Sequence, residues 1–383
     1  MPSAAVGDRV GAVAAGVVAA AAGAGRHNGD VGIFGKGKRK GSTEKRRRQA
    51  GAIQDFWQWW GETGSREWST LIGSTEGFPD AAVADLADRV HAIDDGLAWE
   101  TAAGSESMHV LVVSPEGDPE LRAVARRWLD AAPEADLVWS YADSRPPVAD
   151  PQDHAVVIDE RRFEGGQVVV GVHRRGSRVD VVLHHPLFPE VPEQVRTQVM
   201  FLMLDVTLGE QQTETWIGEL TASEVPPLDG FGLTGLRAVV RDLAAEFITD
   251  TGEPAWAILE GEGPSGPVIA SAEVPLAAAM NPRLSEHVLV EAGYGHRTEQ
   301  GLPADASLSA LRSLEDDLTR AAGPDGRVVA HETSAGVRLL HLYVDPATDA
   351  VPRIEQAVRG WDGTARVRTD DDPGWAEVAH LRG

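Results

Sequence analysis

The chain has 383 residues, of which 42% are hydrophobic and 25% are charged, and this composition is typical of a soluble globular protein with more than one domain. It contains no cysteine, which excludes disulfides, thiol chemistry and thiolate metal sites. The net charge is −24, but residues 1–50 carry ten basic and three acidic residues (+7), so residues 51–383 carry −31. A body this acidic repels phosphate backbones, so we expect no nucleic-acid binding by the folded part.

Residues 1–50 are expected to form a disordered leader. Residues 10–25 are almost wholly Ala, Gly and Val, and they are too short and too weakly apolar for a membrane span. The natural protein is hypothesised to begin at Val31, because the sequence from there resembles an ordinary start. The basic run from Lys36 to Arg48 either only solubilises the leader or makes weak contact with an anionic membrane.

An aromatic-rich segment follows at residues 55–72. Phe56, Trp60 and Trp68 lie near one face of a helix drawn through it, which indicates either a packed helix or a platform for a carbohydrate or nucleobase. In an acidic body without other polar signals, a helix packed into the core is the favoured interpretation.

The stretch up to residue 221 alternates between strand and helix patterns and is predicted to be an N-terminal α+β domain over residues 51–221. Pro79 begins a helix, and Asp118 followed by Pro119 is a good start for the next one. The helix at 193–208 has a nearly uniform apolar centre and should be buried on most sides, with Gly209 as its C-cap. Strands are expected at 97–102, 108–113, 137–141, 154–159, 167–174, 178–185 and 216–220.

Residues 222–231, with Pro226 and Pro227, are predicted to link the two domains, and residues 232–383 to form a C-terminal α+β domain. After one connecting helix, strands are expected at 254–260, 267–273, 285–292, 326–333, 337–343 and 364–369, and helices at 305–321 and 348–359. The last six elements follow the order β-α-β-β-α-β, which predicts a ferredoxin-like domain with an additional N-terminal hairpin and with helices packed on an antiparallel sheet.

The C-terminal segment also carries a recognisable series of motifs. A Leu-spaced helix is followed by a hairpin marked by Thr333, Gly336 and Arg338, a second helix, and a terminal Asp-Pro-Gly-Trp that ends at Trp375. This order resembles the family catalogued as domain of unknown function 695, best over about 254–381 and more weakly over 55–221. The family has no established activity, so the resemblance implies a fold and no catalytic residues. Trp375 is expected to fix the tail to the domain.

Histidines offer the only candidate chemistry, because the sequence has no phosphate loop, Rossmann fingerprint, HExxH or GxSxG motif. If the hairpin loop is Ser334-Ala335-Gly336, Glu332 lies opposite Arg338, and the side chains on the face away from the helices form one open patch. The predicted binding patch consists of His287, Glu291, His331, His341 and Tyr343. A two-residue loop at Ala335-Gly336 would instead place His331 and His341 on opposite faces.

A second histidine group, His173, His184 and His185, is not expected to bind a metal, because adjacent strand residues point to opposite faces. We therefore expect no metal site and no cofactor.

The sequence favours a cytoplasmic binding or interaction module without intrinsic catalysis, with an unidentified protein as its partner. One alternative is a metal-dependent or His-assisted hydrolase that uses the open sheet face of the C-terminal domain. Another is a peripheral membrane protein held by the basic leader.

Overall fold

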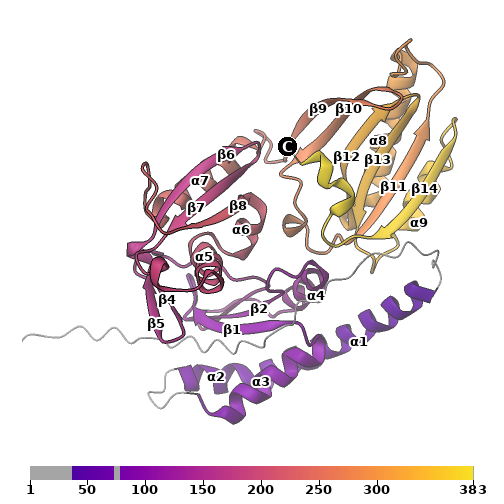
Figure 1. Ribbon diagram of the computed structural model, residues 1–383. Helices are drawn as coiled ribbons and strands as arrows, with labels where there is room; N and C mark the ends of the chain where they lie inside the picture. The colour runs from indigo at the N-terminus through magenta and orange to yellow at the C-terminus, as the bar shows by residue number, and fades with distance from the viewer. Residues whose placement is uncertain (1–36, 73–77, 383) are drawn as a thin grey trace, which may run out of the picture.

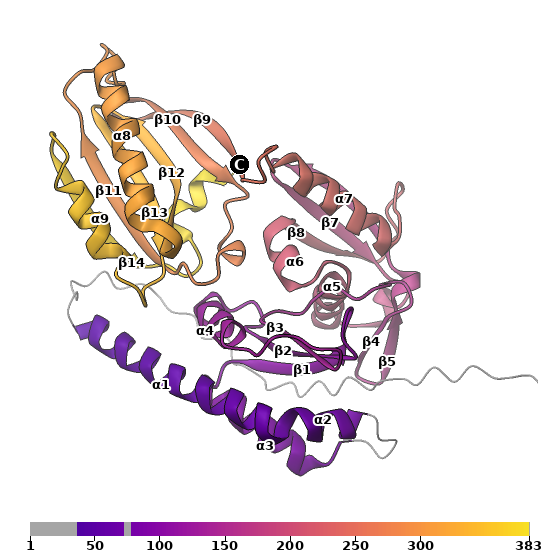
Figure 2. The same ribbon diagram turned by 180° about the vertical axis from the view of Figure 1, so that it is seen from behind.

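The structure is a computed structural model that describes residues 37–72 and 78–382. It is a mixed α+β protein with three packed parts, which we call the first unit (37–142), the second unit (148–247) and the C-terminal domain (255–382) (Figures 1 and 2). In the view of Figure 1 the first unit lies below the other two, and the C-terminal domain lies at the upper right.

The first unit packs helices against a small sheet. Strand β1 pairs with β2 in antiparallel fashion and β2 pairs with β3 in parallel, with α4 as the crossover between β2 and β3. Its elements are α1 (Gly37–Trp59), a short π-helical stretch (Trp60–Gly64), α2 (Ser65–Ile72), α3 (Asp80–Ile93), β1 (Ala98–Ala103), β2 (His109–Ser114), α4 (Pro119–Asp130) and β3 (Trp139–Ala142).

The aromatic segment of the first unit is a packed helix, as predicted. Phe56, Trp60 and Trp68 are all buried, and they share one core with Trp128 and Trp139. The Asp118 side chain accepts a hydrogen bond from the backbone N–H of Glu120 at the start of α4, which confirms the predicted cap.

Helix α1 begins earlier than the sequence patterns indicated. Residues 37–50 were expected to be part of a disordered leader, but they lie in α1, and their helix is continued by the buried aromatic turn. Val31 and residues 10–25 lie outside the described residues. No helix within 37–72 or 78–382 is long and apolar enough to cross a membrane.

The second unit has a small hairpin and a three-stranded sheet covered by three helices. Strands β6 and β7 are antiparallel, and β7 and β8 are parallel, so the order hairpin-crossover-strand of the first unit occurs again. Its elements are β4 (Ala155–Ile158), β5 (Arg161–Glu164), β6 (Val169–Arg175), β7 (Arg178–His184), α5 (Glu193–Leu208), α6 (Glu210–Trp216), β8 (Ile217–Ser223) and α7 (Leu233–Glu246). Gly209, at φ +79, ends α5 as predicted.

The boundary between the second unit and the C-terminal domain does not lie at the predicted linker, residues 222–231. The apolar stripe of α7 (Leu233, Leu236, Val240 and Leu243) belongs to the same core as β6, β7 and α5. This helix was assigned to the C-terminal domain from its position in the sequence, but its stripe is buried against the second unit. The chain leaves that core between Phe247 and Ala255. The predicted N-terminal domain in turn contains two separate cores.

The C-terminal domain is a six-stranded antiparallel sheet with the strand order β14-β11-β13-β12-β10-β9. Helices α8 and α9 lie on one face, which we call the helix face, and the C-terminal segment lies on the other, which we call the tail face (Figure 2). The elements are β9 (Ala255–Gly263), β10 (Gly266–Val274), β11 (Glu286–Gly293), α8 (Asp305–Ala322), β12 (Gly326–Ser334), β13 (Val337–Val344), α9 (Ala350–Val358), β14 (Ala365–Asp371) and the terminal 3-10 turn (Ala376–Leu381).

Candidate functional site

Three of the five predicted patch residues come together on the tail face. His287 on β11 is paired with Tyr343 on β13, and His341 is two residues before Tyr343, so all three side chains project from the same face. The rings of His287 and His341 are stacked with centroids 5.3 Å apart. The face is not open, however: His287, His341 and Tyr343 are only 1%, 4% and 0% exposed.

His331 lies on the opposite face, and the predicted three-residue loop is wrong. The turn has two residues, Ala335 (φ +48) and Gly336 (φ +85), so Thr333 rather than Glu332 pairs with Arg338. In this register His331 pairs with Leu340 and projects toward α8, where its Nδ1 is 3.5 Å from Glu315 Oε2.

The register also explains the family hairpin residues. Arg338 donates a hydrogen bond from Nε to Thr333 Oγ1 at 2.9 Å, and both side chains are buried on the helix face. Arg338 is also 3.7 Å from Glu315. Thr333 and Arg338 therefore belong to a polar contact between the hairpin and α8.

Glu291 is on the tail-face side of β11 but does not join the histidines. Its strand neighbours are Leu339 and Arg366, and its carboxylate lies 3.8 Å from Arg368 Nε. Since it is four residues from His287 along the strand, it lies roughly 13 Å away at about 3.3 Å per residue.

The histidines form a hydrogen-bonded chain that leads from the interior to the surface. His287 Nε2 is 3.1 Å from His341 Nδ1, and His341 Nε2 is 3.1 Å from Glu332 Oε1. The same carboxylate oxygen contacts Nε2 of His380, at 3.0 Å, whose side chain is 55% exposed. We call His287, His341, Glu332 and His380 the histidine chain.

The proton positions in the histidine chain follow from its carboxylate. An ionised carboxylate only accepts, so His341 directs its Nε2–H to Glu332 and, when neutral, accepts at Nδ1 from His287 Nε2–H. His287 Nδ1 is then a lone-pair nitrogen, and it is buried without a hydrogen-bond partner. The inner end of the histidine chain is thus an imidazole nitrogen that carries a lone pair and has no hydrogen-bond partner.

Burial decides the charge of the inner histidine. Desolvation, with a smaller contribution from nearby His341, lowers the pKa of His287 to about 4, so its imidazole is neutral at pH 7. The hydrogen bond from His341 is the main cause of a lowered pKa for Glu332, which therefore keeps its negative charge. An imidazole with so low a pKa is a weak proton acceptor, so His287 stays neutral inside the protein.

Residues 372–382, which we call the tail, cover the histidine chain. Trp375 is 1% exposed, its ring is stacked on Tyr343 with centroids 4.3 Å apart, and its Nε1 donates to Leu284 O at 2.8 Å. Tyr343 in turn donates its hydroxyl to Asp372 Oδ2 at 2.6 Å. The prediction that Trp375 fixes the tail is confirmed, and the tail is the reason that the tail face is closed.

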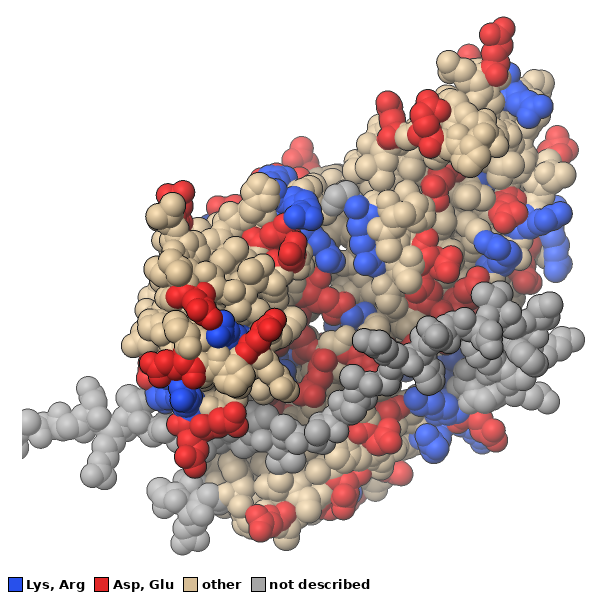
Figure 3. Space-filling model, viewed as in Figure 1, with Lys and Arg blue, Asp and Glu red and all other residues tan. Residues whose placement is uncertain are grey.

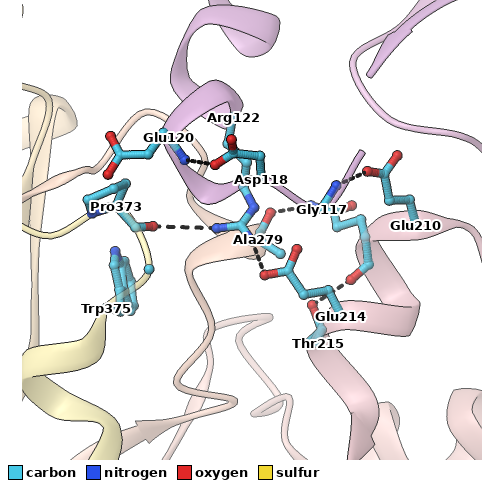
Figure 4. Close-up of polar contacts among 12 residues, drawn as sticks. Gly117, Asp118, Glu120, Arg122, Glu210, Glu214, Thr215, Ala279, Pro373 and Trp375 are labelled. Atoms are coloured by element: carbon cyan, nitrogen blue, oxygen red, sulfur yellow. Dashed lines mark hydrogen bonds and ion pairs between the residues drawn. The ribbon is translucent and has the colours of Figure 1, made fainter. Parts of the chain in front are cut away.

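The tail is also held where the three parts of the molecule meet (Figure 4). Arg122 on α4 is ion-paired with Glu214 on α6 and donates to Pro373 O at 3.4 Å. Nearby, Arg127 contacts Asp345 at 2.5 Å. Through Arg122 and Arg127, the first unit therefore contacts both the second unit and the C-terminal domain.

The enclosed space in this region is small. A cavity of about 10 Å³, room for one water molecule, lies between the second unit and the C-terminal domain, and Arg178, Glu273 and Arg382 are among its lining residues. It does not include the histidine chain. Within residues 37–72 and 78–382, no group of three His, Asp or Glu is arranged to hold a metal ion.

A different surface of the same domain is exposed. Trp256, Ile258, Glu260 and Glu262 occupy every second position of edge strand β9 and so project from one face, which the register with His331 identifies as the helix face. We call these four residues the β9 row. Trp256 is 41% and Ile258 is 73% exposed, and Ile269 beside them on β10 is 36% exposed. Helix α8 packs on β12 and β13 and leaves the β9 row uncovered (Figure 2).

Sequence reasoning missed Glu332 and His380 as partners of the histidines. The predicted three-residue turn placed Glu332 opposite Arg338, whereas the two-residue turn in the structure pairs Glu332 with Leu339. His380 carried no signal of its own, although its position five residues after Trp375 indicated that the tail returns to the sheet.

The comparisons with known proteins address this domain alone. A family of unknown function, DUF695, matches residues 268–378. The match runs from β10 to the tail, includes Thr333, Arg338 and Trp375, and confirms the predicted resemblance for this part of the chain. No curated protein and no solved structure matches the chain. The matched residues begin within β10, so β9 lies outside the match. The resemblance predicted for 55–221 stays a prediction.

Proposed function

We propose that this protein is an interaction module, and that the uncovered β9 edge of its C-terminal sheet binds an extended basic segment of a partner protein. The observation that carries the proposal is the exposure of Trp256 and Ile258, side by side on an edge strand of nine residues. Natural edge strands are normally short, charged or covered, because an open edge pairs with other chains. An apolar edge that is left uncovered is a characteristic of binding by strand addition.

The charge of the β9 row supports a cationic partner. Glu260 and Glu262 continue the row beyond Ile258, and both are exposed. Acidic side chains are also spread over the face of the molecule drawn in Figure 3. An added strand with apolar residues opposite Trp256 and Ile258 and with Lys or Arg opposite the two glutamates would complement the row.

The domain architecture makes the edge available. We infer that the C-terminal domain is ferredoxin-like, with β9 and β10 as an appended hairpin. The inference is supported by the element order β11-α8-β12-β13-α9-β14 and by the strand order β14-β11-β13-β12. The two helices of such a domain cover its own four strands, which leaves the helix face of the appended hairpin free.

The other expectations from the sequence are less well supported by the geometry. The proposed hydrolase depended on an open tail face, and in this structure that face lies under residues 372–382. Weak membrane contact through the basic leader and a cytoplasmic location stay predictions. Basic side chains do gather beside α1 at the lower right of Figure 3.

The proposal is tested with a defined probe on the full chain. A labelled nine-residue peptide of alternating Val and Lys should bind, and the same peptide with Glu in place of Lys or with alternate backbone amides methylated should not. Ile258→Ser should weaken binding about tenfold, whereas Leu228→Ser, a fully exposed leucine on the second unit, should have no effect. Fluorescence anisotropy measures each affinity.

Several results would overturn the proposal. These are failure of the Val-Lys peptide to bind, equal binding of the methylated peptide, or unchanged affinity of Ile258→Ser. Self-association of the chain that Ile258→Ser abolishes would show that the occupant of the edge is a second copy instead of a basic partner.

A further inference from the structure

We propose that the β9 edge selects the direction of its partner segment, which adds antiparallel to β9 with two basic residues preceding two apolar residues at alternate positions. This inference rests on the proposed function, because it assigns an order and a direction to the segment that the β9 row binds. Three features of the edge carry it: the order of the side chains in the row, the backbone groups that the row presents, and a gap at Gly261.

The side chains of the β9 row are ordered along the strand. Trp256 and Ile258 occupy its first half, and Glu260 and Glu262 occupy its second half. All four side chains are exposed. The row is therefore apolar at one end and negatively charged at the other, so for each strand direction a bound segment is complementary in only one order of its residues.

The backbone of the β9 row faces the free edge. Gly263 pairs with Gly266 across a two-residue turn, so this pair is hydrogen bonded, and bonded and non-bonded pairs alternate from there along the hairpin. Pro267 lies opposite Glu262 and fits this alternation, because proline has no N–H for a hydrogen-bonded pair. The β9 row occupies the non-bonded positions, so its backbone N–H and C=O groups point away from β10. The same four residues thus present both the side chains and the hydrogen-bonding groups that an added strand meets.

The direction of the added strand follows from the sheet. Every neighbouring pair of strands in the C-terminal sheet is antiparallel, and antiparallel pairing is the more stable kind per residue. An antiparallel segment runs from Glu262 toward Trp256, so its first residues meet the glutamates. It should therefore carry Lys or Arg first and Val or Ile later, each at every second position.

The residue between the two basic ones meets a gap on the tail face. It lies opposite Gly261, where an added Cβ atom has no neighbour within 4 Å. Val268 is the next residue across the sheet at this position. An aromatic side chain can lie across a strand glycine and pack on the residue beyond it. The preferred segment thus has the order basic, aromatic, basic, any residue, apolar, any residue, apolar.

Two capped peptides of the same composition test the order on the full chain. The forward peptide is Lys-Tyr-Lys-Thr-Val-Thr-Val, and the reversed peptide is Val-Thr-Val-Thr-Lys-Tyr-Lys. We expect fluorescence anisotropy to show that the forward peptide binds about fivefold more tightly. A chain with both Glu260→Lys and Glu262→Lys should instead prefer Glu-Tyr-Glu-Thr-Val-Thr-Val to its reverse, and this restored preference would also show that the substituted edge is folded.

The absence of cysteine in the chain permits a direct measurement of direction. Ser265→Cys places one nitroxide at the exposed turn of the hairpin, and the forward peptide carries a second nitroxide on its first or on its last residue. Electron paramagnetic resonance should find the label on the first residue closer to position 265 by roughly 20 Å, which is six residue steps of about 3.3 Å. Gly261→Val fills the gap, so it should abolish a preference of about twofold for Tyr over Ala between the two lysines.

The outcomes separate this inference from the proposed function. Equal affinities of the forward and reversed peptides, a last-residue label nearer to position 265, or a preference for Tyr that persists in Gly261→Val would overturn the inference and leave the edge as the binding site. Failure of every peptide to bind would overturn the proposed function itself.

Discussion

Arg145 contacts Glu100 and Glu116 of the first unit and Asp205 of the second unit, and we call this contact the joint. The joint and the tail face both bury titratable groups, yet they respond to pH in opposite directions. At the joint, burial favours the protonated and neutral form of a carboxyl group, so it raises the pKa of Asp205. On the tail face, burial favours the deprotonated and neutral form of an imidazole, so it lowers the pKa of His287. The same physical cause therefore makes one region more stable in acid and the other less stable.

The signs follow from proton binding in the folded and unfolded states. Between the ordinary Asp value of 3.8 and about 7, the folded joint holds a proton that the unfolded chain has lost, so its stability falls as the pH rises through this window. Between about 4 and the ordinary His value of 6.5, the unfolded chain holds a proton that folded His287 rejects, so the stability of the sheet falls as the pH drops through this window. Global unfolding averages the two effects, whereas native-state hydrogen exchange separates them by region.

The largest expected effect is at the joint. Arg145→Met removes the cation that contacts the largely buried Asp205 and the more exposed Glu100 and Glu116. The loss of this charged contact should cost the first and second units on the order of 3 kcal/mol at pH 8. The loss should be smaller at pH 5.5, where Asp205 is protonated. Hydrogen exchange of the α5 and α6 amides at both pH values measures the difference. Arg175→Met, whose ion-paired side chain is 70% exposed, is the control and should cost less than about 1 kcal/mol. An equal loss at both pH values would contradict the assignment of the proton to Asp205.

A second substitution should remove the opposing response of the sheet. His287→Leu has no imidazole to protonate in the unfolded state, so the C-terminal domain should lose its destabilisation between pH 6.5 and about 4. The stability of the variant minus that of the unsubstituted protein should be on the order of 2–3 kcal/mol higher at pH 4.5 than at pH 8. At pH 8 the imidazole is neutral in both the folded and the unfolded state. Exchange rates of the β11 and β13 amides test this, and an unchanged slope would show that His287 does not titrate differently on folding.

The smallest effect is expected at the outer end of the histidine chain. Glu332→Gln keeps an acceptor but removes the charge that receives two imidazole N–H groups, and it should cost about 1 kcal/mol. Nitrogen-15 spectra should also show a change in the tautomer balance of His341 and His380, because the carboxylate no longer fixes it. Glu299→Gln, an exposed carboxylate on the same domain, should change stability by less than about 0.5 kcal/mol. Unchanged imidazole spectra in Glu332→Gln would mean that the carboxylate does not set the tautomers.

The sequence by itself determined most of the elements of this protein, because their signals are local, although it predicted no helix at 37–50 or at 210–216. The Asp118 cap and the apolar centre of 193–208 required only neighbouring residues, and both elements formed where they were predicted. The order of strands and helices in the DUF695 segment and the anchoring role of Trp375 were also readable from the chain.

Only the tertiary structure decided which elements meet. The apolar stripe of α7 suits either neighbour, and packing placed it in the second unit. The choice between a two-residue and a three-residue turn moved His331 to the other face, because a shift of one residue reverses every side chain on a strand. The tail closes the predicted patch, and beside the joint Ser114 donates a hydrogen bond to Glu210, 96 positions further along the chain. Such contacts depend on long-range burial and charge, which no pattern of neighbouring residues records.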